Sequence, residues 1–259
     1  MKAIALTFNY NITGDNSLDS IGRHWAIDAY KNKEFIFKYS AAAYATFLHH
    51  HQNIAFDILT DDVSLMEMHL SQYQVNLNQV NFIDWSEELS IHKKYKYAFE
   101  PLIQLIKKYR DSNEYILKID NDLIFKGELS LDEKKIAVWK YERNVKNGNP
   151  LWGEKHLCQK TVGTIDFDVY NIGLLGLPTS YWEIYEEYLE TCYNMIDVDI
   201  SDITDVNSEI YHCCEQTSHN YIFSKHGLEI QQTHNIVDHN FDNKEKCIEE
   251  AKYLLKEKQ

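Results

Sequence analysis

The sequence predicts an α/β fold in which a mostly parallel central sheet is flanked by helices. Apolar runs of strand length alternate with longer segments of helical composition through the first half of the chain. This alternation is typical of parallel sheets. The chain has 259 residues, no Pro/Gly/Ser-rich linker and no internal repeat. A chain of this length can bury a full core, so we expect residues 1–259 to form a single domain.

Each element is expected from its local pattern. The first apolar run ends at the polar residues Asn9 and Tyr10, and the segment 35–51 combines an apolar face with an Ala run. Pro101 falls in the first turn of an expected helix, where proline is tolerated. Strands are expected at 4–8, 53–60, 80–84, 115–119, 135–140 and 169–177. Helices are expected at 35–51, 64–74, 99–109, 181–195, 208–226 and 244–257.

Composition limits the environment and the partners. A formal net charge of −14 disfavours nucleic acid as the main partner, although a metal and a few local cations can still admit a phosphorylated ligand. The five Cys residues form no C-x-x-C pair, which indicates a reducing compartment without a disulfide framework. No apolar run has the length of a signal peptide or a membrane span. We expect a cytoplasmic protein without a transmembrane segment, and its oligomeric state stays open.

The strongest chemical signal is the acidic triplet Asp120-Asn121-Asp122. It directly follows the expected strand at 115–119, and a second apolar stretch follows it. Ligands of open α/β sheets bind beyond the carboxyl ends of the strands. Mg²⁺ and Mn²⁺ prefer oxygen ligands and are commonly held by one or two carboxylates plus substrate phosphates. The alternative is a surface turn, because Asp and Asn are good turn formers. The triplet between two apolar runs favours a Mn²⁺ or Mg²⁺ site.

The ends of the first two strands should lie at the same crevice. Their polar neighbours are therefore candidates for binding a nucleotide base and ribose. Two cations, Arg23 and Lys96, are candidate partners of a diphosphate, and each has the alternative of a solvated surface charge. The candidates at the strand ends are Thr7, Phe8, Asn9, Tyr10, Thr60, Asp61 and Asp62.

Three segments resemble GT-A glycosyltransferases. The run from Tyr115 to Phe125 resembles the D-x-D region of that family, and Asp168 to Leu175 resembles its Asn-x-Gly strand. The pair Glu215-Gln216 resembles an acidic-Gln pair of glycogenin-like members. The resemblance implies a GT-A (Rossmann-like) fold, with a nucleotide-sugar-binding half at about 1–125 and an acceptor-binding half at about 126–259. It also implies sugar transfer from a nucleotide-diphosphate donor, preferably a UDP-sugar, to a glycan or other hydroxyl acceptor.

The resemblance also implies roles for individual residues. Asp120 and Asn121 would meet the donor, Asp120 and Asp122 would hold the metal, and a C-terminal His would add a ligand. His239 is the first candidate for that ligand and His234 the second, although the following segment lacks the family's Gly- and Lys-containing pattern. Asn171 would orient the sugar by hydrogen bonds, and Gly173 would allow a substrate to approach closely.

The catalytic base depends on the stereochemical outcome. An inverting enzyme needs a carboxylate to accept the proton of the acceptor hydroxyl, for which Glu215 is the first choice and Asp168 the second. A retaining enzyme needs no base at that position. Two other function classes stay open. A sugar-phosphate nucleotidyltransferase would carry a Gly-rich loop after the first strand, where this chain has only Gly14. A non-catalytic nucleotide-sugar-binding module would share the fold.

Overall fold

A twisted seven-stranded sheet forms the centre of the molecule. The computed structural model describes residues 1–8, 32–92, 100–147, 154–199, 214–240 and 243–256. The strands of this sheet are β1 (Lys2–Thr7), β2 (Ala55–Thr60), β3 (Val80–Asp84), β4 (Ile116–Ile119), β6 (Ile136–Asn144), β7 (Asp168–Leu177) and β8 (Ile230–Gln232). Their order is β3-β2-β1-β4-β7-β6-β8. Only β7 runs antiparallel to its neighbours, so the sheet is mostly parallel.

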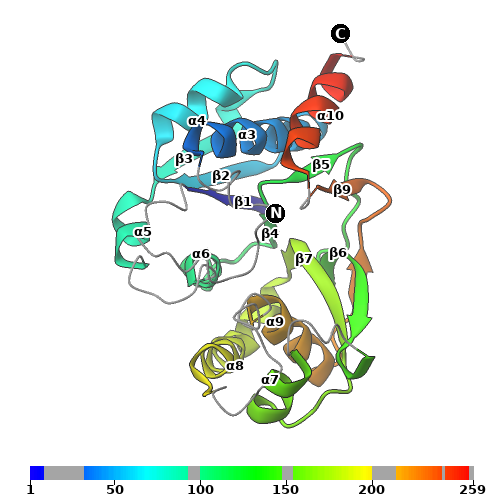
Figure 1. Ribbon diagram of the computed structural model, residues 1–259. Coiled ribbons are helices and arrows are strands. Elements are labelled where there is room, and N and C mark those ends of the chain that lie inside the picture. Colours follow the sequence, from blue (N-terminus) through cyan, green and yellow to red (C-terminus); the bar gives the residue numbers. More distant parts are fainter. Residues whose placement is uncertain (9–31, 93–99, 148–153, 200–213, 241–242, 257–259) are drawn as a thin grey trace.

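Helices cover both faces of the sheet. Figure 1 shows α3, α4 and α10 on one side and α6, α8 and α9 on the other. The α-helices are α3 (Lys33–His50), α4 (Val63–Leu70), α5 (Ser86–His92), α6 (Glu100–Lys108), α7 (Glu154–Thr161), α8 (Tyr185–Asp197), α9 (Cys214–Lys225) and α10 (Lys244–Lys256). Short 3₁₀ turns lie at Leu77–Gln79, Val145–Asn147 and Thr179–Ile184.

The alternation of side chains along the central strands builds two cores. In β1, Ala3 and Ala5 belong to the core under α3, whereas Ile4 and Leu6 belong to the core on the opposite face, which also contains residues of α6, α8 and α9. Successive side chains of a strand point to opposite faces of the sheet, and both faces are covered here. This explains why the central strands are continuous apolar runs instead of half-polar ones.

A second, two-stranded sheet positions the candidate site. It pairs β5 (Leu123–Phe125) with β9 (Val237–His239) in antiparallel register. The backbone N–H of Phe125 donates to Thr46 of α3 at 3.0 Å, and Val237 accepts a hydrogen bond from the Trp139 indole at 2.7 Å. The turn at 120–122 joins β4 to β5. Because β5 pairs with β9, the small sheet brings residues 237–239 next to the edge of the large sheet.

The predicted fold class is confirmed, and the expected elements are present with shifted ends. The helix expected at 208–226 is described from Cys214, and residues 208–213 lie outside the described part. The expected helix at 181–195 begins as a 3₁₀ turn. The additional elements α5, α7, β5, β8 and β9 were not expected from the sequence.

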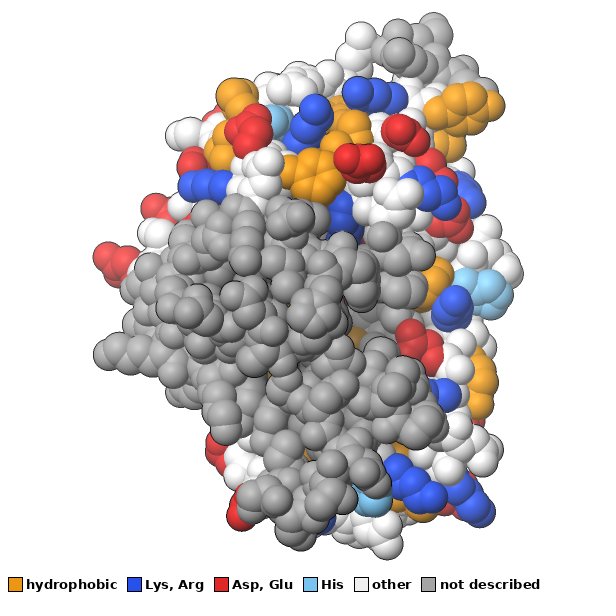
Figure 2. Space-filling model, in the orientation of Figure 1, with side chains coloured by type: hydrophobic (Ala, Val, Ile, Leu, Met, Phe, Trp, Pro, Cys, Tyr) orange, Lys and Arg blue, Asp and Glu red, His pale blue; other side chains and the backbone are white. Residues whose placement is uncertain are grey.

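Two features of the described residues are the charge distribution of one face and the length of the helices. Figure 2 shows Lys and Arg side chains interspersed with Asp and Glu side chains over the described part of one face. Among the described helices, none combines the length and the apolar character needed to cross a bilayer.

Candidate metal and substrate site

The acidic triplet lies where three parallel strands end. Ala5 of β1 is paired with Ile119 of β4, so Asp120 follows at the level of the end of β1. Asn121 and Asp122 form the turn between β4 and β5. Although this is a turn, Asp122 is only 4% exposed. A turn former at the surface would be solvated, so burial of this carboxylate needs a chemical reason.

His239 joins the two carboxylates through the small sheet. It is paired in register with Leu123, and its Nε2 lies 3.0 Å from Asp122 Oδ1. Asp120, Asp122 and His239 each offer one ligand atom, and these atoms lie within 4.8 Å of one another. Carboxylate oxygens suit hard divalent cations, and an imidazole nitrogen is a common ligand of divalent transition metals. The residues present therefore fit the divalent cation expected from the sequence.

Gly173 makes room for His239. The backbone N–H of Asp120 donates to the Gly173 carbonyl at 2.8 Å, which joins β7 to the triplet. A Cβ atom at Gly173 would lie 2.7 Å from His239 Cε1 and 3.0 Å from Asn171 Oδ1. The space beside this glycine is thus filled by the imidazole ring, whereas the sequence resemblance implied the close approach of a substrate there.

The Gly173→Ala variant is therefore expected to displace the His239 ring and to weaken Mn²⁺ binding by about tenfold or more, the range seen when a metal ligand loses its support. Isothermal titration with Mn²⁺ measures this directly. Gly127→Ala is the matched control, because its Cβ would meet only Ile236 at 3.6 Å. Equal Mn²⁺ affinity in the wild type and Gly173→Ala would show that His239 does not contribute to binding.

Two buried lysines accompany the carboxylates. Lys118 Nζ lies 2.8 Å from Asp120 Oδ1 and donates to the Ile172 carbonyl at 3.2 Å, and Lys244 of α10 contacts Asp122 Oδ2. Burial favours the neutral form of Asp122, but His239 and Lys244 outweigh it and hold the pKa of the carboxyl well below its usual range. Asp122 is therefore ionised, as a metal ligand must be.

The Glu215 carboxylate lies on the other side of Lys118. Its Oε1 is 3.8 Å from Lys118 Nζ, and its side chain is 5% exposed. Burial raises the pKa of Glu215, and Lys118 offsets part of this rise. Asp120, whose side chain is 29% exposed, thus forms one charged row with the buried Lys118 and Glu215 across the end of the central sheet.

Asp168 lies away from this row. It is the first residue of β7, five residues before Gly173, which is roughly 16 Å along an extended strand. Its Oδ1 accepts a hydrogen bond from Asn144 at 3.0 Å. It lines a cavity of about 340 Å³ together with Asn144, Asp166, Phe167, Tyr170, Asn220, Phe223, Ser224, Leu228 and Ile230. The structure does not bring Asp168 to the triplet.

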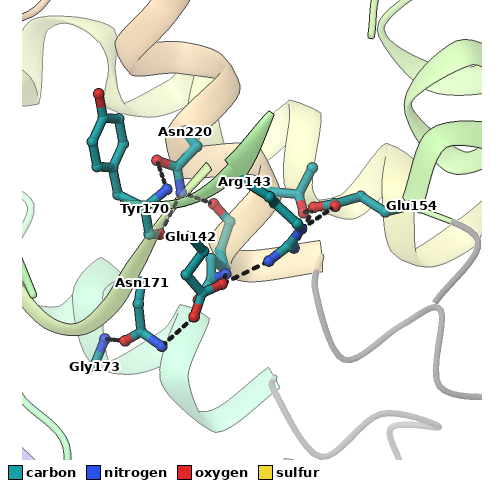
Figure 3. Close-up of polar contacts among 9 residues, drawn as sticks. Glu142, Arg143, Glu154, Tyr170, Asn171, Gly173 and Asn220 are labelled. Carbon is teal, nitrogen blue, oxygen red and sulfur yellow. Dashed lines mark hydrogen bonds and ion pairs between the residues drawn. The ribbon is translucent and has the colours of Figure 1, made fainter. Parts of the chain in front are cut away.

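Asn171 is brought close to the triplet through Gly173. Its Oδ1 accepts from the Gly173 N–H at 2.8 Å, and its Nδ2 donates to Glu142 Oε1 at 2.8 Å. Figure 3 shows this amide between Gly173 and Glu142. Both ends of the Asn171 side chain are therefore fixed by the protein.

The candidates at the ends of the first two strands lie at the same sheet edge. Thr7 is buried and its hydroxyl shares a hydrogen bond with Tyr44 at 2.7 Å, and Phe8 is 4% exposed. Asp61 follows β2 and is half-buried, and Asp62 caps α4 by accepting from the Leu65 N–H at 3.0 Å. His234 is exposed in the turn before β9. The candidates Asn9, Tyr10, Arg23 and Lys96 lie outside the described residues.

Sequence reasoning missed Lys118, Glu142 and Lys244. The triplet itself gave a signal for Lys118, since a lysine two residues earlier in a buried strand points to the same face as Asp120. Lys244 follows His239 by five residues, and the structure brings it to Asp122 although no Gly- and Lys-containing pattern of the familiar spacing is present. Glu142 had no local signal, because its partners come from other strands and helices.

Comparisons with known proteins give fold-level similarity only. No protein-family model matches the chain, and no curated protein matches it. Among solved structures, mouse xyloside xylosyltransferase 1 in its apo form is 12% identical with a TM-score of 0.49, over 90% of this chain and 84% of that chain. An active-site mutant of LgtC is 13% identical with a TM-score of 0.46, over 83% and 70%.

The chain is also similar to a bacterial glycosyltransferase structure. A third example is the apo-form glycosyltransferase GlyE of Streptococcus pneumoniae, which is 14% identical with a TM-score of 0.41, over 89% of this chain and 45% of that chain. All these identities are low, so the chemistry of the site is derived from the residues of this chain.

Proposed function

We propose that the chain is a metal-dependent glycosyltransferase that moves a sugar from a nucleotide-diphosphate donor to a hydroxyl acceptor. The observation that carries this proposal is the convergence of Asp120, Asp122 and His239, whose ligand atoms lie within 4.8 Å of one another. Asp120 and Asp122 follow the carboxyl end of the parallel strand β4, where open α/β sheets bind their ligands, and His239 reaches them from β9. A bound Mn²⁺ or Mg²⁺ would neutralise the negative charge that develops on a departing nucleoside diphosphate.

The lysine contacts are consistent with this chemistry. Without a metal, the ammonium of Lys244 balances the Asp122 carboxylate, because a buried carboxylate needs a positive partner. A divalent cation at Asp122 would repel Lys244, and the diphosphate of the donor would then offer its ammonium an anionic partner. Lys118, in contrast, is anchored to Asp120 and to the Ile172 carbonyl and would stay in place. We assign Lys244 to the diphosphate and Lys118 to the support of Asp120.

The remaining roles follow from position. Thr7, Phe8 and Asp61 lie at the sheet edge assigned to the nucleotide, and UDP-sugars are the preferred donors because the resemblance implies them. The donor sugar would lie near Asp120 and Asn171. Glu215 stays the candidate base of an inverting reaction, because Asp168 lies away from the triplet. Assays with different nucleotide sugars and acceptors determine whether the transferred sugar is a hexose or a pentose, and which acceptor receives it.

A thermal-shift panel of nucleotide sugars with and without Mn²⁺ tests the function. A ligand at about 100 times its Kd stabilises the fold by about 2.7 kcal/mol, which corresponds to a rise in Tm of roughly 5–10 °C for a chain of this size. We expect this rise for one nucleotide class and only with Mn²⁺.

Enzymatic assays separate the alternatives. Release of nucleoside diphosphate from the nucleotide sugar supports the transferase, whereas binding without any release would indicate a non-catalytic module. Release of pyrophosphate from a nucleoside triphosphate and a sugar phosphate would indicate a nucleotidyltransferase. No metal-dependent shift with any nucleotide sugar would contradict the proposal.

A further inference from the structure

A polar network lies beside the triplet and centres on Glu142 of β6. Glu142 accepts three hydrogen bonds, from Asn171 Nδ2 at 2.8 Å, from Gln216 Nε2 at 3.0 Å and from Arg143 Nη1 at 2.6 Å. Its side chain is 22% exposed. Figure 3 shows the Glu142 carboxylate between Asn171 and Arg143. One carboxylate therefore joins residues of β6, β7 and α9.

Arg143 fixes the position of Glu142 by linking it to Glu154. The Arg143 guanidinium donates to Glu154 of α7 through Nε at 2.7 Å and Nη2 at 2.8 Å. Glu154 is 1% exposed and also accepts from Thr217 Oγ1 at 2.6 Å. A bidentate pair of this kind restricts the planar guanidinium to one orientation. The third nitrogen of Arg143 is thereby aimed at Glu142.

A carboxylate can form a hydrogen bond with only one end of an amide group. It only accepts hydrogen bonds, whereas an amide has a donating nitrogen end and an accepting oxygen end. Asn171 and Gln216 must therefore both turn their nitrogen toward Glu142. For Asn171, this leaves Oδ1 for the Gly173 N–H at 2.8 Å. For Gln216, it turns the carbonyl oxygen Oε1 away from Glu142.

This arrangement continues to the metal ligands. The Gly173 carbonyl accepts from the Asp120 N–H, and the missing Cβ of Gly173 gives space to His239. On α9, Gln216 directly follows Glu215, and its backbone carbonyl accepts from Asn220 Nδ2 at 2.8 Å. Asn220 in turn bonds both the N–H and the carbonyl of Tyr170. Asn220 thus ties the middle of α9 to β7.

We propose that Glu142 is a positioning residue that fixes the orientation of the Asn171 and Gln216 amides for sugar transfer at the neighbouring triplet. The inference rests on the proposed function for the identity of the ligand. The orientation of the amides themselves follows from the contacts of Glu142 alone. Glu142 acts through its neighbours and does not contact the substrate.

The Glu142→Gln variant tests this role, because it keeps the shape of the side chain and removes its charge. A glutamine can donate as well as accept, so either end of Gln216 can then face it. We expect kcat for sugar transfer to fall between about 10- and 100-fold, the effect of a small misplacement of a positioned group. The Mn²⁺-dependent thermal shift with the donor is expected to persist. Glu229→Gln is the matched control, since Glu229 pairs with Lys135 at 2.8 Å and is exposed.

A second readout does not depend on activity. The side-chain amide of Gln216 gives a ¹H–¹⁵N NMR signal that the Gln216→Met variant identifies by its loss. We expect this signal to move in Glu142→Gln and to stay in place in Glu229→Gln. An unmoved signal would overturn the proposal even if the wild type transferred no sugar. Absence of transfer by the wild type, with the signal moving as expected, would contradict the proposed function and leave the positioning role standing.

A double-mutant cycle guards against a purely structural effect. If Glu142 acts through Gln216, then Glu142→Gln and Gln216→Met lower kcat by similar factors, and the double variant is no slower than the worse single one. Multiplicative losses in the double variant would overturn the proposal. If Glu142→Gln fails to fold, Glu142→Asp replaces it, because the shorter carboxylate keeps the charge while withdrawing from both amides.

Discussion

The Asp122→Asn variant is expected to lower the rate of metal-dependent sugar transfer by roughly 10³-fold or more. Metal stabilisation of a leaving group contributes several kcal/mol to the transition state, and each 1.36 kcal/mol corresponds to a factor of ten. Asn keeps the shape of the side chain but removes the charge that Asp122 offers to a cation. Steady-state release of nucleoside diphosphate at saturating Mn²⁺ measures this loss.

The control for this variant is Asp238→Asn. Asp238 precedes His239 in β9 and pairs with Lys126. Like Asp122 it has a lysine partner, but it lies outside the acidic triplet. We expect its transfer rate to stay within about twofold of the wild type, since exposed ion pairs contribute little. A transfer rate in Asp122→Asn equal to that of Asp238→Asn would show that the metal does not act at Asp122.

The Lys118→Met variant is expected to lower the free energy of unfolding by about 3 kcal/mol, because it leaves the buried Glu215 carboxyl and the partly exposed Asp120 carboxylate without their shared partner. Lys118 is 1% exposed. Burial alone would lower its pKa, but Asp120 and Glu215 outweigh this effect and raise it. The lysine is therefore charged in the folded protein, and its loss removes the positive partner of two carboxyl groups at once. Urea unfolding followed by circular dichroism gives the difference.

Two further variants identify the cause of this instability. Lys135→Met removes a lysine from an exposed pair with Glu229, and we expect a change below about 1 kcal/mol. Combining Lys118→Met with Glu215→Leu removes one of the two uncompensated charges, so part of the lost stability should return. A Lys118→Met variant as stable as Lys135→Met would mean that the charged row does not support the fold.

The fold was predictable because its strands carry strong local patterns. The first strand is apolar at every position from Ala3 to Leu6, as expected for a strand covered on both faces. In contrast, β5 and β9 have three residues each, too few for any periodicity to be recognised. Helix α7 was missed because only Leu157 and Cys158 of its eight residues are apolar side chains that it buries.

The site was predictable only in part, for a related reason. Asp120 and Asp122 follow a strand, and the strand rule places them at a crevice. The partners of the triplet come from distant segments, and the contact between Lys244 and Asp122 joins residues 122 positions apart. Tertiary packing of α10 on α3 and of β9 on β5 brings them together. The role of Gly173 likewise depends on the His239 ring, which no pattern within residues 168–177 can reveal.

Crystals grown with Mn²⁺ and a nucleoside diphosphate, and measured at a wavelength where manganese scatters anomalously, test the central claim most directly. We expect one strong anomalous peak bounded by Asp120, Asp122 and His239, with the ammonium of Lys244 moved from Asp122 to the diphosphate. A well-ordered nucleotide with no manganese peak between these three side chains, and with Lys244 still on Asp122, would contradict the account.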